Sequence, residues 1–214
     1  MAQIPARSLG SLTTSAIGFG AMVLSPGMYG EIDDDRAVRA LHAALDVGVT
    51  LVDVTGAQLR EAHAVHPVTA VQTQWSMWQT PDQELLATAR ELGIGIVAWS
   101  PLGGGFLTGT VHQIAPDDFR TNVPRFSSTN LAANNQRYAP VRGIAADLGL
   151  TPGQLALAWL LHQDDHVVPI PGSRTPAHIA ENTDAARVVL HPDTLAQIDE
   201  ALARFDPTGE GALL

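Results

Sequence analysis

Short apolar runs alternate with longer, one-sided apolar stretches along this chain of 214 residues. Short runs of this kind are typical of strands that are buried on both faces. The strands expected on this basis are AIGFG at 16–20, TLVD at 50–53, AVQTQ at 70–74, GIVAW at 95–99 and VVPI at 167–170. Residues 8–15 alternate serine, threonine and glycine, and they predict a small hairpin.

Helical patterns fill the intervals between these runs. We expect helices at 33–48, 55–66, 80–93, 134–148 and 151–163, one that starts at 176, and a last one from 191 to 205. TPDQ at 80–83 and TPGQ at 151–154 both have the pattern of a capping box with proline at the first helical position. Pro140 predicts either a kink in the helix at 134–148 or its true start.

The alternation of strands and helices predicts parallel βαβ units and therefore an α/β fold. No GxGxxG motif follows the first strand, so the residues do not indicate a Rossmann dinucleotide site. A barrel-type arrangement is the better interpretation, with the functional site at the carboxyl ends of the strands. Residues 101–130 form a long predicted loop, and loops of this length are usually functional.

The stretch VVPIPGSRTPAHIAEN at 167–182 combines a strand, a tight turn and a helix start. Thr175 can cap a helix whose first residue is Pro176. Ser173 and Arg174 stand beside the N–H groups of that helix start, a combination that suits a phosphate. An ordinary strand-to-helix turn with a surface arginine is the alternative, and it fits the stretch better when the stretch is taken alone.

Composition narrows the range of functions. The net charge of −10 argues against nucleic acid or an anionic membrane as a partner. The chain has no cysteine, which excludes a disulfide framework or a thiolate site. No stretch has the pattern of a signal peptide or of a membrane span, so we expect a cytoplasmic protein. All 12 basic residues are arginine, and lysine is absent.

Six segments carry a resemblance to one family, and they follow the order in which that family has them. They are IGFGAM at 17–22, VQTQWSMW at 71–78, VAWSPLGGGFLTG at 97–109, DDFRTNVPRF at 117–126, TPGQLALAWLL at 151–161, and VPIPGSR at 168–174 with IAEN at 179–182. With these motifs the chain resembles the aldo-keto reductases. These are NADP(H)-dependent carbonyl oxidoreductases, and they are built on a (β/α)8 barrel of the TIM type.

The resemblance implies a nicotinamide site at one end of the sheet. Gly20, Ala21 and Met22 would lie at the nicotinamide, and Gln72 would hydrogen-bond its carboxamide. Trp99 would stack on the nicotinamide face, a role that an amphipathic ring suits. The alternative for Trp99 is a core aromatic at the end of a strand.

The resemblance also implies contacts to the rest of NADP(H). The contact residues would be Ser100, Leu102 and Gly104 under the pyrophosphate, Gly172, Ser173 and Arg174 at the 2′-phosphate, and Glu181 and Asn182 at the adenine.

Catalysis in the family uses an aspartate, a tyrosine that donates the proton, a lysine and a histidine. The resemblance assigns the aspartate to Asp53. The residues that follow, VTGAQL at 54–59, resemble the start of the family's fifth helix and not the tyrosine turn. We therefore expect a single domain over 1–214 from which three middle βα units are deleted near 53–55. Tyrosine, lysine and histidine of the catalytic set would be lost with them.

The remaining tyrosines do not fill the catalytic gap in the sequence. The chain contains only Tyr29 and Tyr138. Tyr29 lies in the first βα loop, at the mouth of the expected barrel, but the segment around it matches a loop of the family and not the catalytic turn. Asp53 is therefore the one expected remnant of the catalytic set.

The expected deletion leaves strands one, two, six, seven and eight, which would form one continuous arc because strand eight neighbours strand one. Eight strands fill a barrel interior with side chains, and five are too few for a regular closed barrel. We therefore expect an incomplete (β/α)8 barrel of five parallel strands in an open or distorted arc. Its two strand edges would favour association, so a homo-oligomer formed through them is a hypothesis.

Three functions are compatible with this interpretation. The first is NADP(H)-dependent reduction of a small-molecule carbonyl, slowed by the missing proton donor. The second is an NADP(H)-binding protein without catalysis, with a regulatory or partner role. The third is a deletion product without a selected function.

Overall fold

The computed structural model describes residues 6–9, 12–15, 59, 60, 63, 68–173 and 176–210. These residues belong to two compact units. The first contains the described residues up to 73 together with 81–97 and 165–168; the second contains 74–80, 98–164 and the described residues from 169 onward. The strands expected at 16–20 and 50–53 and the helix expected at 33–48 lie outside the described residues. Of the helix expected at 55–66, Leu59, Arg60 and His63 are described and are helical.

A short hairpin is the first element of the chain. Strand β1 (Ala6–Leu9) pairs with strand β2 (Leu12–Ser15) in antiparallel orientation, with Leu9 opposite Leu12. The hairpin predicted at 8–15 is therefore confirmed, and it begins two residues earlier than expected.

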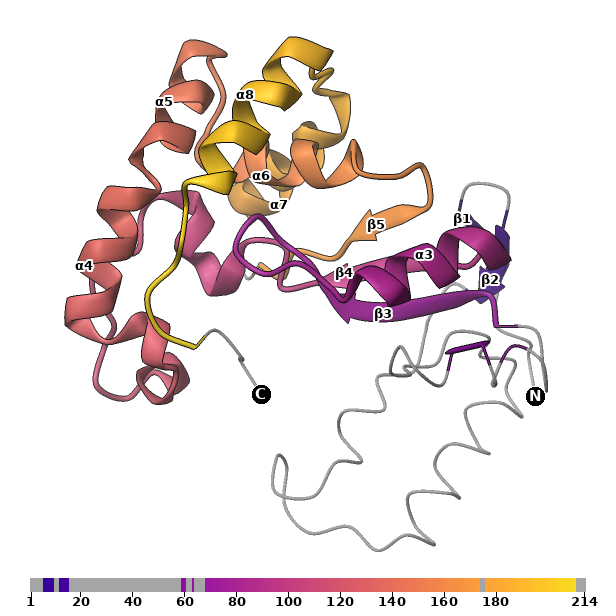
Figure 1. The fold of residues 1–214 in the computed structure, drawn as a ribbon, viewed down its shortest axis with the longest axis horizontal. Coiled ribbons are helices and arrows are strands. Elements are labelled where there is room, and N and C mark those ends of the chain that lie inside the picture. The colour runs from indigo at the N-terminus through magenta and orange to yellow at the C-terminus, as the bar shows by residue number, and fades with distance from the viewer. Residues whose placement is uncertain are drawn as a thin grey trace, which may run out of the picture. The chain divides into compact units, whose positions relative to one another are not determined.

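Three parallel strands form an open sheet in the order β3-β4-β5 (Figure 1). They are β3 (Ala70–Gln74), β4 (Gly95–Trp99) and β5 (Val167–Pro169). The N–H of Gly95 donates to Thr69 O at 3.0 Å, and the N–H of Ile96 donates to His166 O at 2.8 Å. The bounds predicted for β3 and β4 are confirmed.

The last strand differs from its prediction. β5 ends at Pro169, and of its residues only Val167 is buried. Ile170 is 44% exposed, so the expectation that 167–170 is buried on both faces is wrong. The N–H of Ile170 still donates to Ala98 O on β4 at 2.9 Å, but Ile170 also lines a pocket, which leaves it partly exposed.

The α/β class and the parallel arrangement agree with the expected fold. Five strands were expected in the arc, and the described part of the chain contains three of them. These three are the neighbours that an open arc requires, in the expected order.

Helix α3 (Gln83–Leu92) belongs to the first unit. Its N-cap is Asp82, whose carboxylate accepts the N–H of Glu84 at 3.2 Å, so the capping box predicted at Thr80 is wrong. The true cap lies two residues later because the Asp82 side chain reaches the free N–H groups of the first turn. Gly93 ends the helix in the left-handed conformation (φ 65°), as expected.

The second unit is mainly helical. Its long predicted loop at 101–130 contains the 3-10 helices η3 (Gly103–Thr108), η4 (Phe119–Asn122) and η5 (Pro124–Phe126). The helix expected at 134–148 is in fact two helices, α4 (Ser128–Arg137) and α5 (Ala139–Asp147). Pro140 lies in the first turn of α5, so it marks a helix start and not a kink.

Helix α6 (Pro152–Leu161) is the central helix of the second unit (Figure 1). The capping box predicted at 151–154 is confirmed: Thr151 Oγ1 accepts the N–H of Gln154, and the Gln154 side chain accepts the N–H of Thr151. Helix α6 contacts α5, η3 and two later elements, α7 (Pro176–Asp184) and η6 (Ala185–Arg187). Its residues 155–160 are all buried, which fits a central position.

Helix α8 (Pro192–Ala203) begins one residue after the predicted start at 191, with His191 as its N-cap, and it ends before the predicted end at 205. Ile198 of α8 is fully buried, and Phe205 beyond its end is 6% exposed. The Phe205 ring belongs to an aromatic cluster with Phe106 and Tyr138, with ring centroids 6.3 Å and 5.4 Å away. This cluster joins the start of the long loop, α5 and the end of α8.

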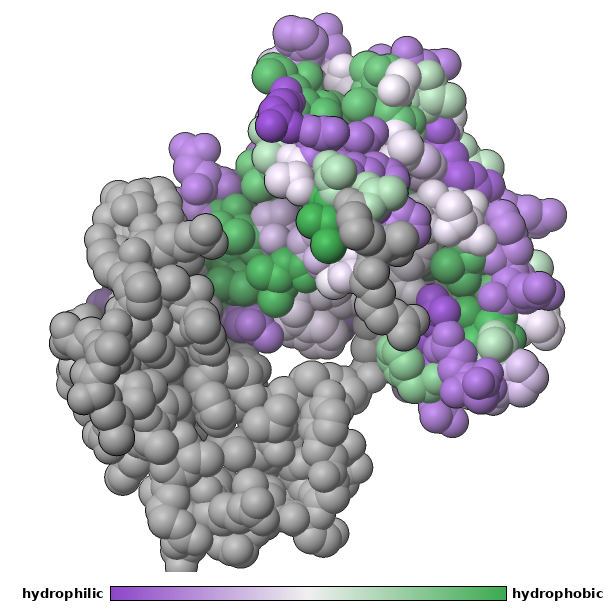
Figure 2. Space-filling model, turned by 180° about the vertical axis from the view of Figure 1, so that it is seen from behind, coloured by the Kyte–Doolittle hydropathy of each residue, from purple (hydrophilic) through white to green (hydrophobic). Residues whose placement is uncertain are grey.

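Among the residues that Figure 2 colours by hydropathy, hydrophilic side chains are interspersed with apolar areas on the face shown. The large apolar residues that are exposed in the described part are Phe119, Leu148, Ile170, Ile179 and Val189. No single described helix is long and apolar enough to cross a membrane; α5 and α6 meet that criterion only as a pair, bent by 88°.

Truncation of the central helix tests this account of the core. Leu155 of α6 is fully buried, and Ile179 of α7 is 53% exposed. Leu155→Ala should lower the free energy of unfolding by about 2–5 kcal/mol, because it removes buried methyl groups and leaves a cavity. Ile179→Ala is the matched control and should cost less than about 1 kcal/mol. Urea unfolding measures both, and equal losses would contradict the assignment of α6 to the core.

Candidate functional site

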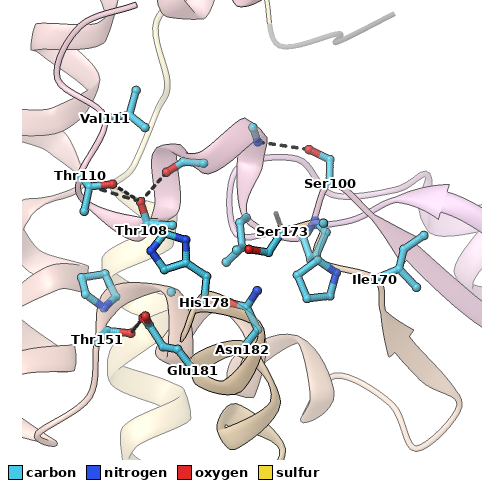
Figure 3. A pocket seen from close by; sticks show the side chains of 18 residues that line it. Ser100, Thr108, Thr110, Val111, Thr151, Ile170, Ser173, His178, Glu181 and Asn182 are labelled. Atoms are coloured by element: carbon cyan, nitrogen blue, oxygen red, sulfur yellow. Dashed lines mark hydrogen bonds between the residues drawn. The ribbon is translucent and has the colours of Figure 1, made fainter. Parts of the chain in front are cut away.

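A pocket of about 670 Å³ lies in the second unit, beside the segments that follow β4 and β5. Its walls come from the loop after β4, the start of α6, the turn after β5 and the first turns of α7 (Figure 3). The carboxyl ends of parallel strands are the usual place for ligands in α/β folds. The pocket is therefore the candidate site.

Seven residues that the resemblance assigns to NADP(H) line this one pocket. They are Ser100, Leu102, Gly104, Gly172, Ser173, Glu181 and Asn182. They come from three segments that are well separated in the sequence, and the fold brings them together. Their roles in cofactor binding stay predictions.

Other predicted site residues lie elsewhere or outside the described residues. Gln72 lies on β3 and Trp99 at the end of β4; both are half-buried, and neither is among the residues that line the pocket. Gly20, Ala21, Met22, Asp53 and Arg174 lie outside the described residues.

The loop after β4 has an unusual backbone. Ser100 has a φ of 51°, and Gly103, Gly104 and Gly105 have φ values of 57°, 62° and 91°. A Cβ atom on Gly103 would lie 2.8 Å from Cε3 of Trp78, so both the left-handed φ and the close approach require glycine there. We call residues 100–105 the glycine loop.

Hydrogen bonds within the glycine loop use its own N–H groups. Gly103 N–H donates to Ser100 O at 2.9 Å, and Gly104 N–H donates to Ser100 Oγ at 3.2 Å (Figure 3). Gly105 N–H donates to Leu102 O at 3.0 Å. The N–H groups of Gly103, Gly104 and Gly105 are thus all engaged within the loop.

The wall opposite carries a carboxylate. Thr151 Oγ1 donates to Glu181 Oε1 at 2.6 Å, so the cap of α6 is tied to a side chain of α7 (Figure 3). Gln154 Nε2 also donates to Glu181 O at 3.4 Å. A fixed carboxylate repels phosphate but accepts hydrogen bonds from an amino group, which an adenine ring provides.

Sequence reasoning did not assign several residues of the pocket. Thr108 and Thr110 hydrogen-bond each other through their hydroxyls at 2.8 Å, and Thr108 Oγ1 also donates to Gly105 O at 2.7 Å. His178 lines the pocket as well, and Figure 3 shows its ring among the lining side chains. Its spacing of three and four residues from Glu181 and Asn182 could have found it, because such residues share a helix face.

Tyr138 belongs to the core and cannot serve as the missing proton donor. Its ring is fully buried, and its hydroxyl donates to Met77 Sδ at 3.5 Å. The Phe106 ring lies 5.4 Å away. Burial raises the pKa of Tyr138 above its ordinary value, so the hydroxyl stays protonated and out of reach of a substrate. Tyr29 lies outside the described residues.

His162 has a structural role. His162 Nδ1 lies 2.7 Å from Ala158 O, and its Nε2 accepts the N–H of Leu190 at 3.2 Å. Both ring nitrogens are thereby engaged by backbone groups. Among the described residues, no group of three or more potential metal ligands forms a metal site.

An ion pair borders the glycine loop. Arg120 Nη2 lies 2.6 Å from Asp118 Oδ2, and both side chains are largely shielded, with exposures of 23% and 22%. The hydrogen bonds from the Arg120 side chain and then from its backbone N–H lower the pKa of Asp118 to about 2. Asp118 also caps η4 by accepting the N–H of Arg120 at 2.9 Å.

The chain is similar to known proteins in both sequence and fold. A model of the Aldo/keto reductase family matches residues 54–203. A thermostable aldo-keto reductase in complex with the inhibitor epalrestat aligns at 21% identity and a TM-score of 0.53, over 79% of this chain and 55% of that one. The glycerol dehydrogenase of Gluconobacter oxydans aligns at 22% identity and a TM-score of 0.66, over 84% of this chain and 58% of that one.

These two structures are similar to the chain in fold. The chain spans less than two thirds of the length of either of them. The similarity therefore covers part of each neighbour's fold.

The ion pair at the glycine loop predicts a dependence of stability on pH. The pKa of Asp118 is about 2 in the folded chain, below the value of about 3.9 for an unfolded aspartate. Its contribution is present in full above about pH 4 and is lost as the pH falls toward 2, because the folded state must then give up an ionised carboxylate. Asp118→Asn should remove this part of the acid dependence. Thermal unfolding from pH 2 to 6 measures it, and parallel curves for the two proteins would contradict the assignment.

Proposed function

Because the chain belongs to the aldo/keto reductase family, we propose that its pocket binds NADP(H). Members of this family generally bind NAD(P)H. The observation that carries the proposal is the convergence of Ser100, Ser173 and Asn182 and four further predicted contacts on one pocket. An ordinary loop cluster would not bring seven predicted contact residues, from three separate segments, to one pocket.

The chemistry of the walls supports this ligand class. The turn at 171–173 and the start of α7 provide a helix N-terminus, which favours a phosphate. Arg174 follows directly in the sequence and is the proposed partner of the 2′-phosphate. Further along helix α7, the carboxylate of Glu181 suits the amino group of adenine. The pocket thus provides for both ends of an adenosine 2′-phosphate.

Carbonyl reduction at an ordinary rate is not part of the proposal. The chain has no lysine, and Tyr138 is a core residue. A reductase without its proton donor loses a factor on the order of 10²–10⁴ in rate. The proposed function is therefore NADP(H) binding, with carbonyl reduction slow at best.

The alignment supports an internal deletion. The match to the family model begins at residue 54, directly after Asp53. The Gluconobacter neighbour aligns with 84% of this chain, which is more than residues 54–203 can supply, yet only 58% of that neighbour is covered. Loss of the middle βα units would have this effect, because it removes the tyrosine turn and keeps the later strands.

Titration with NADPH tests the proposed function. We expect saturable binding, seen as a change in NADPH or tryptophan fluorescence, that 2′-AMP competes away. A turnover assay with a generic aldehyde should then show a rate lower by roughly 10²–10⁴ than that of a complete family member. Absence of NADPH binding would refute the proposal, and full turnover would refute the account of catalysis.

Replacement of the proposed phosphate partner is the second test. Arg174→Ala should weaken NADPH by roughly 10- to 100-fold and NADH only slightly, because a charge-assisted hydrogen bond to the 2′-phosphate is lost. Arg187→Ala is a suitable control, since this arginine has a side chain that is 77% exposed and pairs with Asp184. Equal weakening of NADPH and NADH by Arg174→Ala would show the assignment to be wrong.

A further inference from the structure

Arg120 connects η4 to the glycine loop. Its Nη1 donates to Gly104 O at 2.7 Å. Its Nε donates to both carboxylate oxygens of Asp118, at 3.0 Å and 3.1 Å, and its Nη2 donates to Oδ2 at 2.6 Å. The guanidinium carbon also lies 5.7 Å from the centroid of the Phe126 ring. One side chain thus holds a carboxylate, a carbonyl and an aromatic face.

These contacts differ from those of an ordinary surface ion pair. Exposed pairs contribute little because both side chains stay mobile and solvated. The Arg120 side chain is only 23% exposed. Its bonds to Asp118 orient the planar guanidinium fork so that Nη1 points to Gly104 O. A lysine could not make the same set of bonds, because its ammonium group is a point charge without that fork.

The glycine loop has a particular need for such a contact. Gly103, Gly104 and Gly105 all have positive φ values, and glycine is the residue with the most backbone freedom to lose on folding. The internal hydrogen bonds of the loop engage its N–H groups, as at Gly104, whereas Arg120 engages a carbonyl. Both the N–H group and the carbonyl group of Gly104 are therefore hydrogen-bonded.

We propose that Arg120 is a positioning residue for the nucleotide pocket: by holding the Gly104 carbonyl, it fixes the glycine loop in the shape that a pyrophosphate needs. This inference rests on the proposed NADP(H) site. Gly104 and Gly105 line the pocket, whereas Arg120 is not among the described residues that line it. Arg120 therefore acts through the loop. Its charge is balanced by Asp118, so loop geometry and not long-range attraction carries the effect.

The packing around Gly104 supports the same conclusion. A Cβ atom on Gly104 would lie 3.0 Å from Cζ of Phe126, the ring that Arg120 covers. A Cβ atom on Gly105 would lie 3.5 Å from Nη1 of Arg120. The loop, the guanidinium and the Phe126 ring therefore fit closely, and a change in one moves the others.

The test compares two nucleotides that differ at the pyrophosphate. Arg120→Gln should weaken NADPH roughly tenfold, because the loop no longer holds its shape under the pyrophosphate. Binding of 2′-AMP, which has no pyrophosphate, should change less than about twofold. General destabilisation would weaken both nucleotides alike, so the ratio of the two dissociation constants separates a positioning role from a merely structural one.

Arg60→Gln is the matched control. Arg60 also holds a carboxylate with two nitrogens, at 3.1 Å and 2.9 Å from the Glu91 oxygens, and it donates to Thr88 Oγ1 at 3.1 Å. It belongs to the first unit and lies far from the glycine loop in the sequence. The ratio for this variant should equal that of the wild type. Arg120→Lys keeps the charge and should still raise the ratio, because the fork is lost.

Hydrogen exchange provides a readout that does not need a nucleotide. Arg120→Gln should speed exchange at the amides of Gly103, Gly104 and Gly105 by roughly tenfold or more, while the amides of α6 keep their protection. If Arg120→Gln does not fold, Asp118→Asn decides the question, since it frees the guanidinium and should shift both readouts in the same direction.

The outcomes separate the two proposals. If the wild-type chain binds neither NADPH nor 2′-AMP, the proposed function fails, and exchange at the glycine loop still decides whether Arg120 holds it. An unchanged nucleotide ratio in a folded Arg120→Gln, or unchanged exchange at the three glycines, would overturn the positioning role.

Discussion

The close approach of Gly103 to the Trp78 indole is the constraint on which the rest of the second unit depends. Only a residue without Cβ fits there, and the left-handed backbone that follows sends the chain into η3. Phe106 of η3 then packs 4.0 Å from the Trp78 ring, centroid to centroid, and joins Tyr138 and Phe205 in the aromatic cluster. The same turn therefore builds the core on one side and the pocket loop on the other.

The C-terminal segment is attached to this centre by polar side chains. Arg125 donates to Trp78 O at 2.8 Å and to Gly209 O at 2.9 Å, and its guanidinium carbon lies 5.3 Å from the Trp78 ring centroid. The buried Asn134 accepts the N–H of Thr208 at 2.8 Å and donates to Thr208 O at 3.1 Å. Burial lowers the pKa of Arg125, but its two carbonyl partners still satisfy the cation. The segment after α8 is thus held by specific hydrogen bonds as well as by apolar packing.

Under the proposed function, the candidate site would combine a nucleotide pocket with an incomplete catalytic set. Its walls come from segments that follow β4 and β5, so an internal loss of earlier βα units would not touch them. The family's catalytic tyrosine, lysine and histidine would belong to the units that the proposed deletion removes. In a barrel, each strand end carries its own functional residues. Loss of some βα units can therefore remove catalytic residues and leave binding residues in place.

Sequence patterns alone determined the elements whose signals are local. The apolar runs gave β3 and β4 with correct bounds, and the Thr151 capping box was correct because its hydrogen bonds join residues three apart. The Thr80 box failed for a local reason too: Asp82 offers a competing cap two residues later, and sequence cannot rank the two. The family motifs gave the seven pocket residues, whereas His178 was missed although it shares a helix face with Glu181.

Only the tertiary structure shows which side chains are buried in the core and which residues far apart in the sequence form hydrogen bonds. Tyr138 is a core residue because Met77 and the Phe106 ring surround it, and no local pattern shows this. Thr151 supports Glu181, and Arg120 holds Gly104, across 30 and 16 positions of the chain. The physical reason is the range of the interactions: caps, turns and strand propensity act between near neighbours in sequence, but burial and the pairing of buried polar groups depend on which distant segments the fold brings into contact.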